Sequence, residues 1–209
     1  FVYTAVLKFD DDHFTGIPNG TSQEQSFSEY TNGEGFLSTR DNRFKSFQIA
    51  TPNVYTQPHE ASIDVSAFSR NNPSEFANGY NHSFGIAVGN ENNLKKQSLH
   101  NGYYHIRFND VRIQSAELDS VTQLFMGETD VVNRPLSYHT VAYVRLNYRR
   151  NFDLGGKDSL TFTSQVGNDY YRFTRYGKEN PLIYDLTNLE RIVPKLTGQT
   201  IEFNTSASN

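Results

Sequence analysis

Residues 138–150 read YHTVAYVRLNYRR, and this stretch decides the fold. Apolar and polar side chains alternate along it, with Tyr138, Ala142, Val144, Leu146 and Tyr148 at even positions and His139, Arg145, Asn147 and Arg149 at odd ones. A period of two is typical of an antiparallel strand with one buried face. We therefore predict a strand whose even-numbered side chains face a second sheet.

Similar runs recur along the rest of the chain. They span 1–9, 43–50, 60–69, 82–89, 102–109, 111–118, 159–166, 169–176, 181–186 and 191–196. Turn formers such as GNENN (89–93), LGGKD (154–158) and VGND (166–169) stand between them, and the last two predict hairpins joining 140–150, 159–166 and 169–176. Many short strands separated by turns predict an all-β fold, an antiparallel β-sandwich of jelly-roll type.

The regularity of the strand-like patterns along the chain indicates the domain organisation. Residues 11–42 are the least regular part, so residues 1–42 are predicted to be a lead-in strand and irregular segment packed on a sandwich of residues 43–209. One domain over 1–209 is the alternative. A chain of 209 residues buries enough surface to fold without disulfides or metals. The tail FNTSASN (203–209) is predicted to be frayed.

Composition excludes several classes of function. The net charge is −4, without the basic stripe that nucleic-acid binding requires. No apolar run reaches the ~20 residues of a membrane-spanning helix, and no signal peptide is visible. The chain has no cysteine, which excludes disulfides and a cysteine nucleophile in these residues.

Motifs for metal binding or catalysis are sparse. Asp10, Asp11 and Asp12 could offer oxygen ligands to calcium, but their spacing matches no EF-hand loop and acids at a strand end are usually solvated. The six histidines (13, 59, 82, 100, 105 and 139) form no zinc motif. The sequence has no GxSxG elbow, no phosphate-binding loop and no GxGxxG. We predict no cofactor and no enzyme in these residues, with calcium and a self-contained hydrolase as the alternatives.

Paired tyrosines raise a further alternative. Tyr103–Tyr104 and Tyr170–Tyr171 could stack on sugars, as in a carbohydrate-binding jelly-roll module of an exported protein. Neighbours on a strand point to opposite faces, however, so one tyrosine of each pair is expected in the core.

The segments HTVAYVRLNYRRNFDLGGKDSLTF (139–162) and NDYYRFTRYGKENPLIYDLTNLERI (168–192) resemble the gingipain family, in particular its type IX secretion sortases. The matching residues are Ala142, Tyr143, Leu146, Asn147, Tyr148, Arg149, Arg150, Leu160, Phe162, Tyr184, Asp185, Leu186, Thr187 and Asn188. Tyr184 stands where the family commonly has tryptophan, and Leu186 where it has valine.

The resemblance implies a non-catalytic accessory domain. In that family the catalytic cysteine and histidine lie in a caspase-like domain downstream of the Asp-Val-Thr motif that residues 185–187 match. The implied partners are a downstream peptidase domain of the same polypeptide and secreted cargo. The implied location is the outer surface or periplasm of a bacterium.

Asp185 is predicted to be structural. A carboxylate followed by Thr187 and Asn188 is suited to accept backbone N–H bonds from the next turn. Asp185 would thereby fix the path of the chain as it leaves the sandwich.

Overall fold

The computed structural model describes residues 2–14, 35–72, 79–154, 159–162, 170–174 and 181–205. The chain divides into two compact units. The sandwich unit comprises residues 4–52 and 57–148, and the C-terminal unit comprises residues 1–3, 53–56 and 149–209. This division differs from the boundary at residue 42 that the sequence suggested, because residues after 148 build a separate core.

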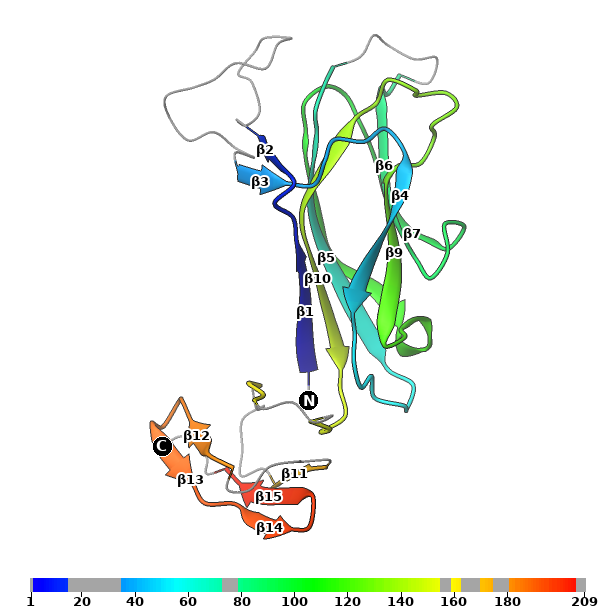
Figure 1. Cartoon of the computed structure of the whole chain (residues 1–209). Coiled ribbons are helices and arrows are strands. Elements are labelled where there is room, and N and C mark those ends of the chain that lie inside the picture. The colour runs from blue at the N-terminus through cyan, green and yellow to red at the C-terminus, as the bar shows by residue number, and fades with distance from the viewer. Residues whose placement is uncertain are drawn as a thin grey trace. The chain divides into compact units, whose positions relative to one another are not determined.

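Two four-stranded sheets lie face to face in the sandwich unit (Figure 1). The first sheet contains, in spatial order, β1 (Val2–Lys8), β10 (His139–Arg149), β5 (Glu60–Ser69) and β8 (His105–Gln114). The second contains β4 (Phe44–Ala50), β9 (Val121–Glu128), β6 (His82–Val88) and β7 (Leu94–His100). If these eight strands are numbered along the chain, the sheets run 1-8-3-6 and 2-7-4-5. This is the jelly-roll arrangement, so the predicted fold class is confirmed.

The core of the sandwich is apolar over most of its length. Both sheets contribute β-branched and aromatic side chains, and the Phe84 and Phe108 ring centroids meet across the gap at 5.9 Å. Fully or nearly fully buried members are Ile63, Val65, Ile86, Val88, Ile106, Ile113, Leu124, Met126, Val144, Leu146 and Tyr148. A short 3-10 turn, Ser115–Glu117, follows β8, and the hairpin of β2 (Asp12–Phe14) and β3 (Gly35–Leu37) stands outside the two sheets.

The alternation in β10 holds over only part of the strand. Val144, Leu146 and Tyr148 are buried as predicted, but a β-bulge at Ala142 breaks the pairing with β5. Because a bulge adds one residue, it exchanges the inward-facing and outward-facing positions in the part of β10 that precedes it. His139 and Val141 are therefore buried, whereas Tyr138 and Ala142 are only half-buried, so the prediction for these two was wrong.

Hydrogen bonds from Ser38 stabilise the bulge. The Ser38 N–H donates to the Val141 carbonyl at 2.8 Å, and the Val141 N–H donates to the Ser38 hydroxyl at 2.9 Å. Ala142 packs on the small cluster of Leu37 and Phe68 instead of the main core.

Several strands differ from the sequence prediction. The runs 102–109 and 111–118 contribute to one strand, β8, and neither the polar strand β7 nor the strand β9 was anticipated. The predicted hairpin of 140–150 with 159–166 does not form, because β1 and β5 occupy both edges of β10 and residues 159–162 are not in a strand. Residues 163–169 lie outside the described part, as does the lead-in from 15 to 34.

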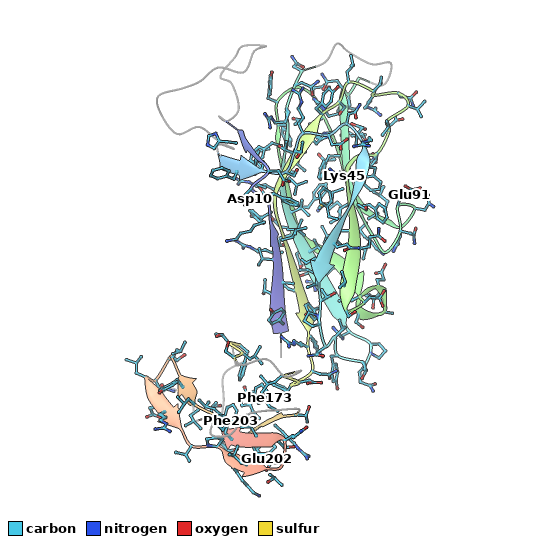
Figure 2. All side chains as sticks on the ribbon, viewed as in Figure 1. Asp10, Lys45, Glu91, Phe173, Glu202 and Phe203 are labelled. Atoms are coloured by element: carbon cyan, nitrogen blue, oxygen red, sulfur yellow. The ribbon has the colours of Figure 1, made fainter. Side chains whose placement is uncertain are left out.

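The C-terminal unit is a separate small β structure. β11 (Tyr170–Phe173), β15 (Thr200–Asn204) and β14 (Lys195–Thr197) form one antiparallel sheet, and β12 (Ile183–Asp185) pairs with β13 (Glu190–Ile192). Its buried cluster is Leu154, Tyr171, Phe173, Ile201 and Phe203. The rings of Phe173 and Phe203 stack at 5.7 Å (Figure 2). Phe203 was predicted to lie in a frayed tail, so that prediction was wrong for residues 203–204.

None of the helices described in the structure is long and apolar enough to cross a membrane.

Candidate functional site

Three histidines from three strands converge inside the sandwich unit. His82 of β6 and His100 of β7 are directly paired across the second sheet, and His139 comes from β10 of the first. One ring nitrogen from each lies within 4.8 Å of those of the other two. We call these residues the histidine cluster. The bulge at Ala142 brings His139 to the inner face.

The rings of the histidine cluster pack closely. The His82 and His100 centroids are 5.1 Å apart with nearly parallel rings, and His139 stands edge-on to both at 5.2 and 5.8 Å. Phe84 and Tyr104 line the outside of the cluster, with Phe84 5.2 Å from His139 and Tyr104 5.0 Å from His100. The exposed fractions are 0% for His82, 7% for His100 and 3% for His139.

Burial keeps all three imidazoles neutral. It lowers the pKa of His82 and of His100 from 6.5 to about 4, and a neighbouring positive group contributes in each case (Arg134 for His82, His82 for His100). The pKa of His139 falls well below its ordinary value, because burial again acts together with the other two rings. Each ring therefore has one N–H and one lone pair at neutral pH.

Both nitrogens of His82 have partners. Nε2 lies 2.9 Å from the carbonyl oxygen of Asn71, and Nδ1 lies 2.7 Å from the hydroxyl oxygen of Ser137. A carbonyl can only accept, so Nε2 carries the proton and Nδ1 accepts from Ser137. In the other two rings of the cluster, three nitrogens are buried and have no hydrogen-bond partner among the described residues: His100 Nε2, His139 Nδ1 and His139 Nε2.

Ser137 also contacts Glu128, which is fully buried. Burial raises the pKa of Glu128, opposed by the nearby Ser137 hydroxyl group, by hydrogen bonds from the backbone N–H groups of Asp130 and Ser83, and by the charge of Arg134. Serine stands here between the histidine and the acid, whereas a hydrolase triad places the histidine between them. With all three groups buried, this arrangement gives no support to the hydrolase alternative.

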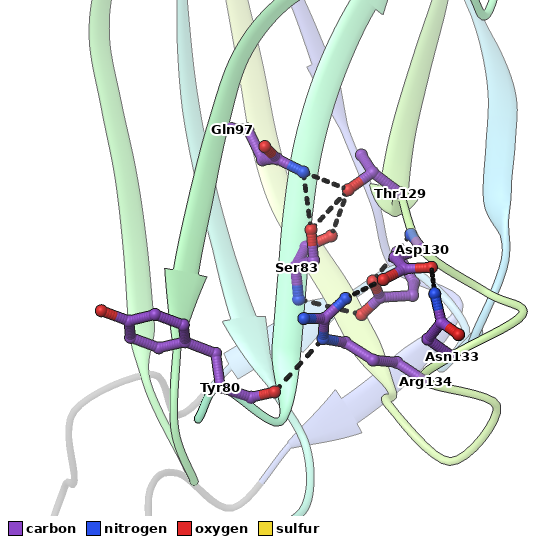
Figure 3. Close-up of polar contacts among 8 residues, drawn as sticks. Tyr80, Ser83, Gln97, Thr129, Asp130, Asn133 and Arg134 are labelled. Carbon is purple, nitrogen blue, oxygen red and sulfur yellow. Dashed lines mark hydrogen bonds and ion pairs between the residues drawn. The ribbon is translucent and has the colours of Figure 1, made fainter. Parts of the chain in front are cut away.

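A polar network adjoins Glu128 (Figure 3). Arg134, 4% exposed, forms an ion pair with Asp130 and donates to the Tyr80 carbonyl at 3.3 Å. The Gln97 amide donates to the hydroxyl groups of Ser83 and Thr129, both at 2.7 Å. These bonds hold residues 128–137 against β6 and β7, and they position Ser137 beside His82.

The residues predicted from sequence do not form this site. Asp10 and Asp11 are exposed, and the side chain of Asp12 lies outside the described part. Among the described residues, the histidine cluster is the one group whose ligand atoms are close enough together to hold a metal ion. Tyr148 is buried at the end of β10 and Arg149 is exposed. No spacing motif could have revealed the histidine cluster, because His100 lies 18 positions after His82 and His139 lies 39 positions after His100 along a jelly-roll path.

Asp185 closes the turn between β12 and β13. Its carboxylate accepts hydrogen bonds from the N–H of Thr187 at 2.8 Å, the N–H of Asn188 at 3.1 Å and the Asn188 amide at 2.9 Å. These bonds, those from Asn188 first, lower the pKa of Asp185. Tyr184 and Leu186, on either side of Asp185, are 58% and 73% exposed.

An open pocket of about 570 Å³ lies beside this turn in the C-terminal unit. It is lined by Tyr170, Asp185, Glu190, Arg191, Ile192, Asn204 and Thr205. The Tyr170 ring is 60% exposed, so the pocket combines an accessible aromatic face with carboxylate, amide and guanidinium groups.

The fold defines an all-β protein built on a jelly-roll sandwich with a second small β unit. Among solved structures it is similar to dimeric latent PorU from Porphyromonas gingivalis, with a TM-score of 0.50 and 10% identity over 98% of this chain. The chain spans 19% of the length of that protein. At this identity the similarity concerns the fold alone. No family model and no curated protein matches the sequence.

Proposed function

We propose that this chain is a non-catalytic accessory module of a PorU-like exported protein, and that it packs on or orients a cysteine-peptidase domain of the same polypeptide. The observation that carries the proposal is the fold similarity, which covers nearly all of this chain and about a fifth of PorU. The absence of cysteine fits, because no such nucleophile can reside in these residues. Docking of secreted cargo at a sheet edge is a further role for such a module.

The sandwich unit suits a role in positioning. Its histidine cluster and Glu128 are buried inside the unit. A jelly roll whose core is closed presents its sheet edges and loops to partners. The proposed location is the outer surface or periplasm of a bacterium.

The test is to read the gene beyond Asn209 and to express the encoded polypeptide with and without residues 1–209. A caspase-like domain should follow, and its thermal midpoint or peptidase activity should fall when residues 1–209 are removed. Residues 1–209 alone should cleave no peptide. A glycosidase in the same reading frame, or a peptidase indifferent to the deletion, would refute the proposal.

A carbohydrate-binding role is the second candidate, and the open pocket of the C-terminal unit favours it. Exposed Tyr170 offers a flat ring for a sugar, and Asp185, Arg191 and Asn204 offer hydrogen bonds. Isothermal titration with bacterial surface glycans should then show binding that Tyr170→Ala abolishes. Tyr80→Ala, an exposed tyrosine of the sandwich unit, is the matched control.

A further inference from the structure

We propose that His82, His100 and His139 bind a divalent transition metal, with zinc as the best fit, and that the ion ties the two sheets of the sandwich together. Two ligands come from neighbouring strands of one sheet and the third from the opposite sheet. One nitrogen of each already lies within 4.8 Å of the others. The inference does not depend on the proposed function.

The unpaired nitrogens are the main argument. A neutral His139 must present one N–H and one lone pair, and neither meets a partner in the part of the chain that the structure describes. Nε2 of His100 is in the same position. Buried polar groups in native proteins nearly always have a partner, so groups that lack one require an explanation. A bound cation would use a lone pair of each ring.

The second argument is the orientation of His82. A metal-binding histidine typically donates its other N–H to a carbonyl oxygen, which fixes the tautomer. The carbonyl of Asn71 does this for His82 Nε2, at 2.9 Å, and so leaves Nδ1 for a ligand. Ser137 currently donates to Nδ1, but its hydroxyl group also contacts Glu128. When a metal occupies Nδ1, Ser137 can donate to Glu128 instead.

The donor set selects the class of ion. Imidazole nitrogens favour zinc, nickel, cobalt and copper over calcium and magnesium, which prefer oxygen ligands. The neutral state of all three rings fits, because metals bind imidazole only in its neutral form. Zn–N bonds of about 2.0–2.1 Å place tetrahedral ligand nitrogens roughly 3.3–3.4 Å apart. Rotations of the rings must therefore close the widest separation by up to about 1.4 Å.

The competing explanation is aromatic packing, in which three neutral rings merely fill the core. Two variants separate the alternatives. His139→Phe keeps a ring against Phe84 and removes both unpaired nitrogens, so it should fold at least as stably as the metal-free chain. His100→Gln removes a different ligand. His105→Gln is the matched control, because His105 lies on β8 and stacks on Phe68 outside the cluster.

The experiment refolds the full chain from denaturant after EDTA treatment, with graded ZnCl₂, and measures the thermal midpoint. Zinc should raise the midpoint of the parent and of His105→Gln in a concentration-dependent manner. In His100→Gln and His139→Phe the zinc affinity should fall by about a hundredfold or more. This exceeds the 10–100-fold loss that is typical when a residue contacts a metal ligand but not the metal itself. CoCl₂ should give the parent the absorption bands of tetrahedral cobalt.

A parent chain that shows neither a zinc-dependent midpoint nor cobalt bands would overturn the proposal. So would a response retained in both cluster variants, or lost equally in His105→Gln, since the ion would then bind elsewhere.

Discussion

Tyr148 shows what one polar atom does at the end of a buried strand. Its side chain is 1% exposed, and its hydroxyl group donates to the Pro52 carbonyl at 3.1 Å. The ring fills the core while the hydroxyl group reaches the loop after β4.

Tyr148→Phe keeps the packing and removes the hydroxyl group. We expect a loss of about 1 kcal/mol in the free energy of unfolding, because one partly buried bond is lost without a cavity. Urea denaturation followed by circular dichroism measures it. Tyr80→Phe, at an exposed position, should leave the urea midpoint in place. An unchanged midpoint in Tyr148→Phe would show that the bond contributes nothing.

The turn at Asp185 in the C-terminal unit allows a prediction about local stability. Asp185→Ala removes the acceptor for the N–H groups of Thr187 and Asn188, so both amides should exchange with solvent faster. Asp185→Asn retains one oxygen acceptor and should have a smaller effect. Amide exchange monitored by NMR tests this order. Equal exchange rates in all three proteins would mean that the turn forms without the side chain.

Acid should have the same effect on this turn. Because hydrogen bonds lower the folded pKa of Asp185, its contribution is present above the unfolded pKa and is lost as the pH falls through the folded value.

Individual elements differ in how far the sequence predicts them. Strong alternation in 60–69 and 144–148 placed β5 and the second half of β10 correctly. β7 reads LKKQSLH and was missed, since an edge strand has little apolar face and its lysines protect it from unwanted pairing. The histidine cluster was missed because the bulge at Ala142 changes which side chains at the start of β10 face inward. A bulge cannot be recognised clearly in a single sequence.

Gly127 determines how closely β9 approaches β4. Its φ of +133° disfavours any side chain, and a Cβ there would lie 2.1 Å from the Arg43 carbonyl oxygen. Gly127→Ala must push the two strands apart, so we expect a loss of about 3 kcal/mol or more, or failure to fold.

Gly89→Ala is the control for that experiment. Gly89 has a φ of +77° and no atom within 4 Å of the added carbon, so only backbone strain of roughly 1 kcal/mol should result. Urea midpoints of the two variants decide the matter. Similar losses would show that conformation, and not the approach of β4, explains the glycine at 127.

For the molecule as a whole, the histidine cluster makes stability depend on pH. In the metal-free protein the folded pKa values of His82 and His100 are about 4, against 6.5 for the ordinary side chain. Between these values the unfolded chain binds more protons, so stability falls as the pH drops from about 6.5 to about 4. Glu128, with its raised pKa, opposes the trend, whereas His105, whose pKa burial also lowers to about 4, adds to it.

Urea midpoints between pH 7.5 and pH 4, with EDTA present, test this dependence. The parent should lose stability steeply over this range, and His139→Phe should lose less because one buried group no longer titrates. His13→Gln, at an exposed position, should follow the parent. A parent midpoint that is flat across the range would contradict the prediction.

The extra residue at Ala142 has a consequence for related genes. In this strand Val141 pairs with Ala67 and Tyr143 with Ser66, so Ala142 is the residue without a partner. Loss of its codon would leave the other pairs with β5 in place and would keep the buried side chains of β10 on the inner face. The strand would then read HTVYVRLNYR, with His, Val, Val, Leu and Tyr at every second position. In relatives with this deletion, inward-facing and outward-facing residues should alternate without interruption from the histidine onward. Deletion of Arg145, in contrast, should not be tolerated.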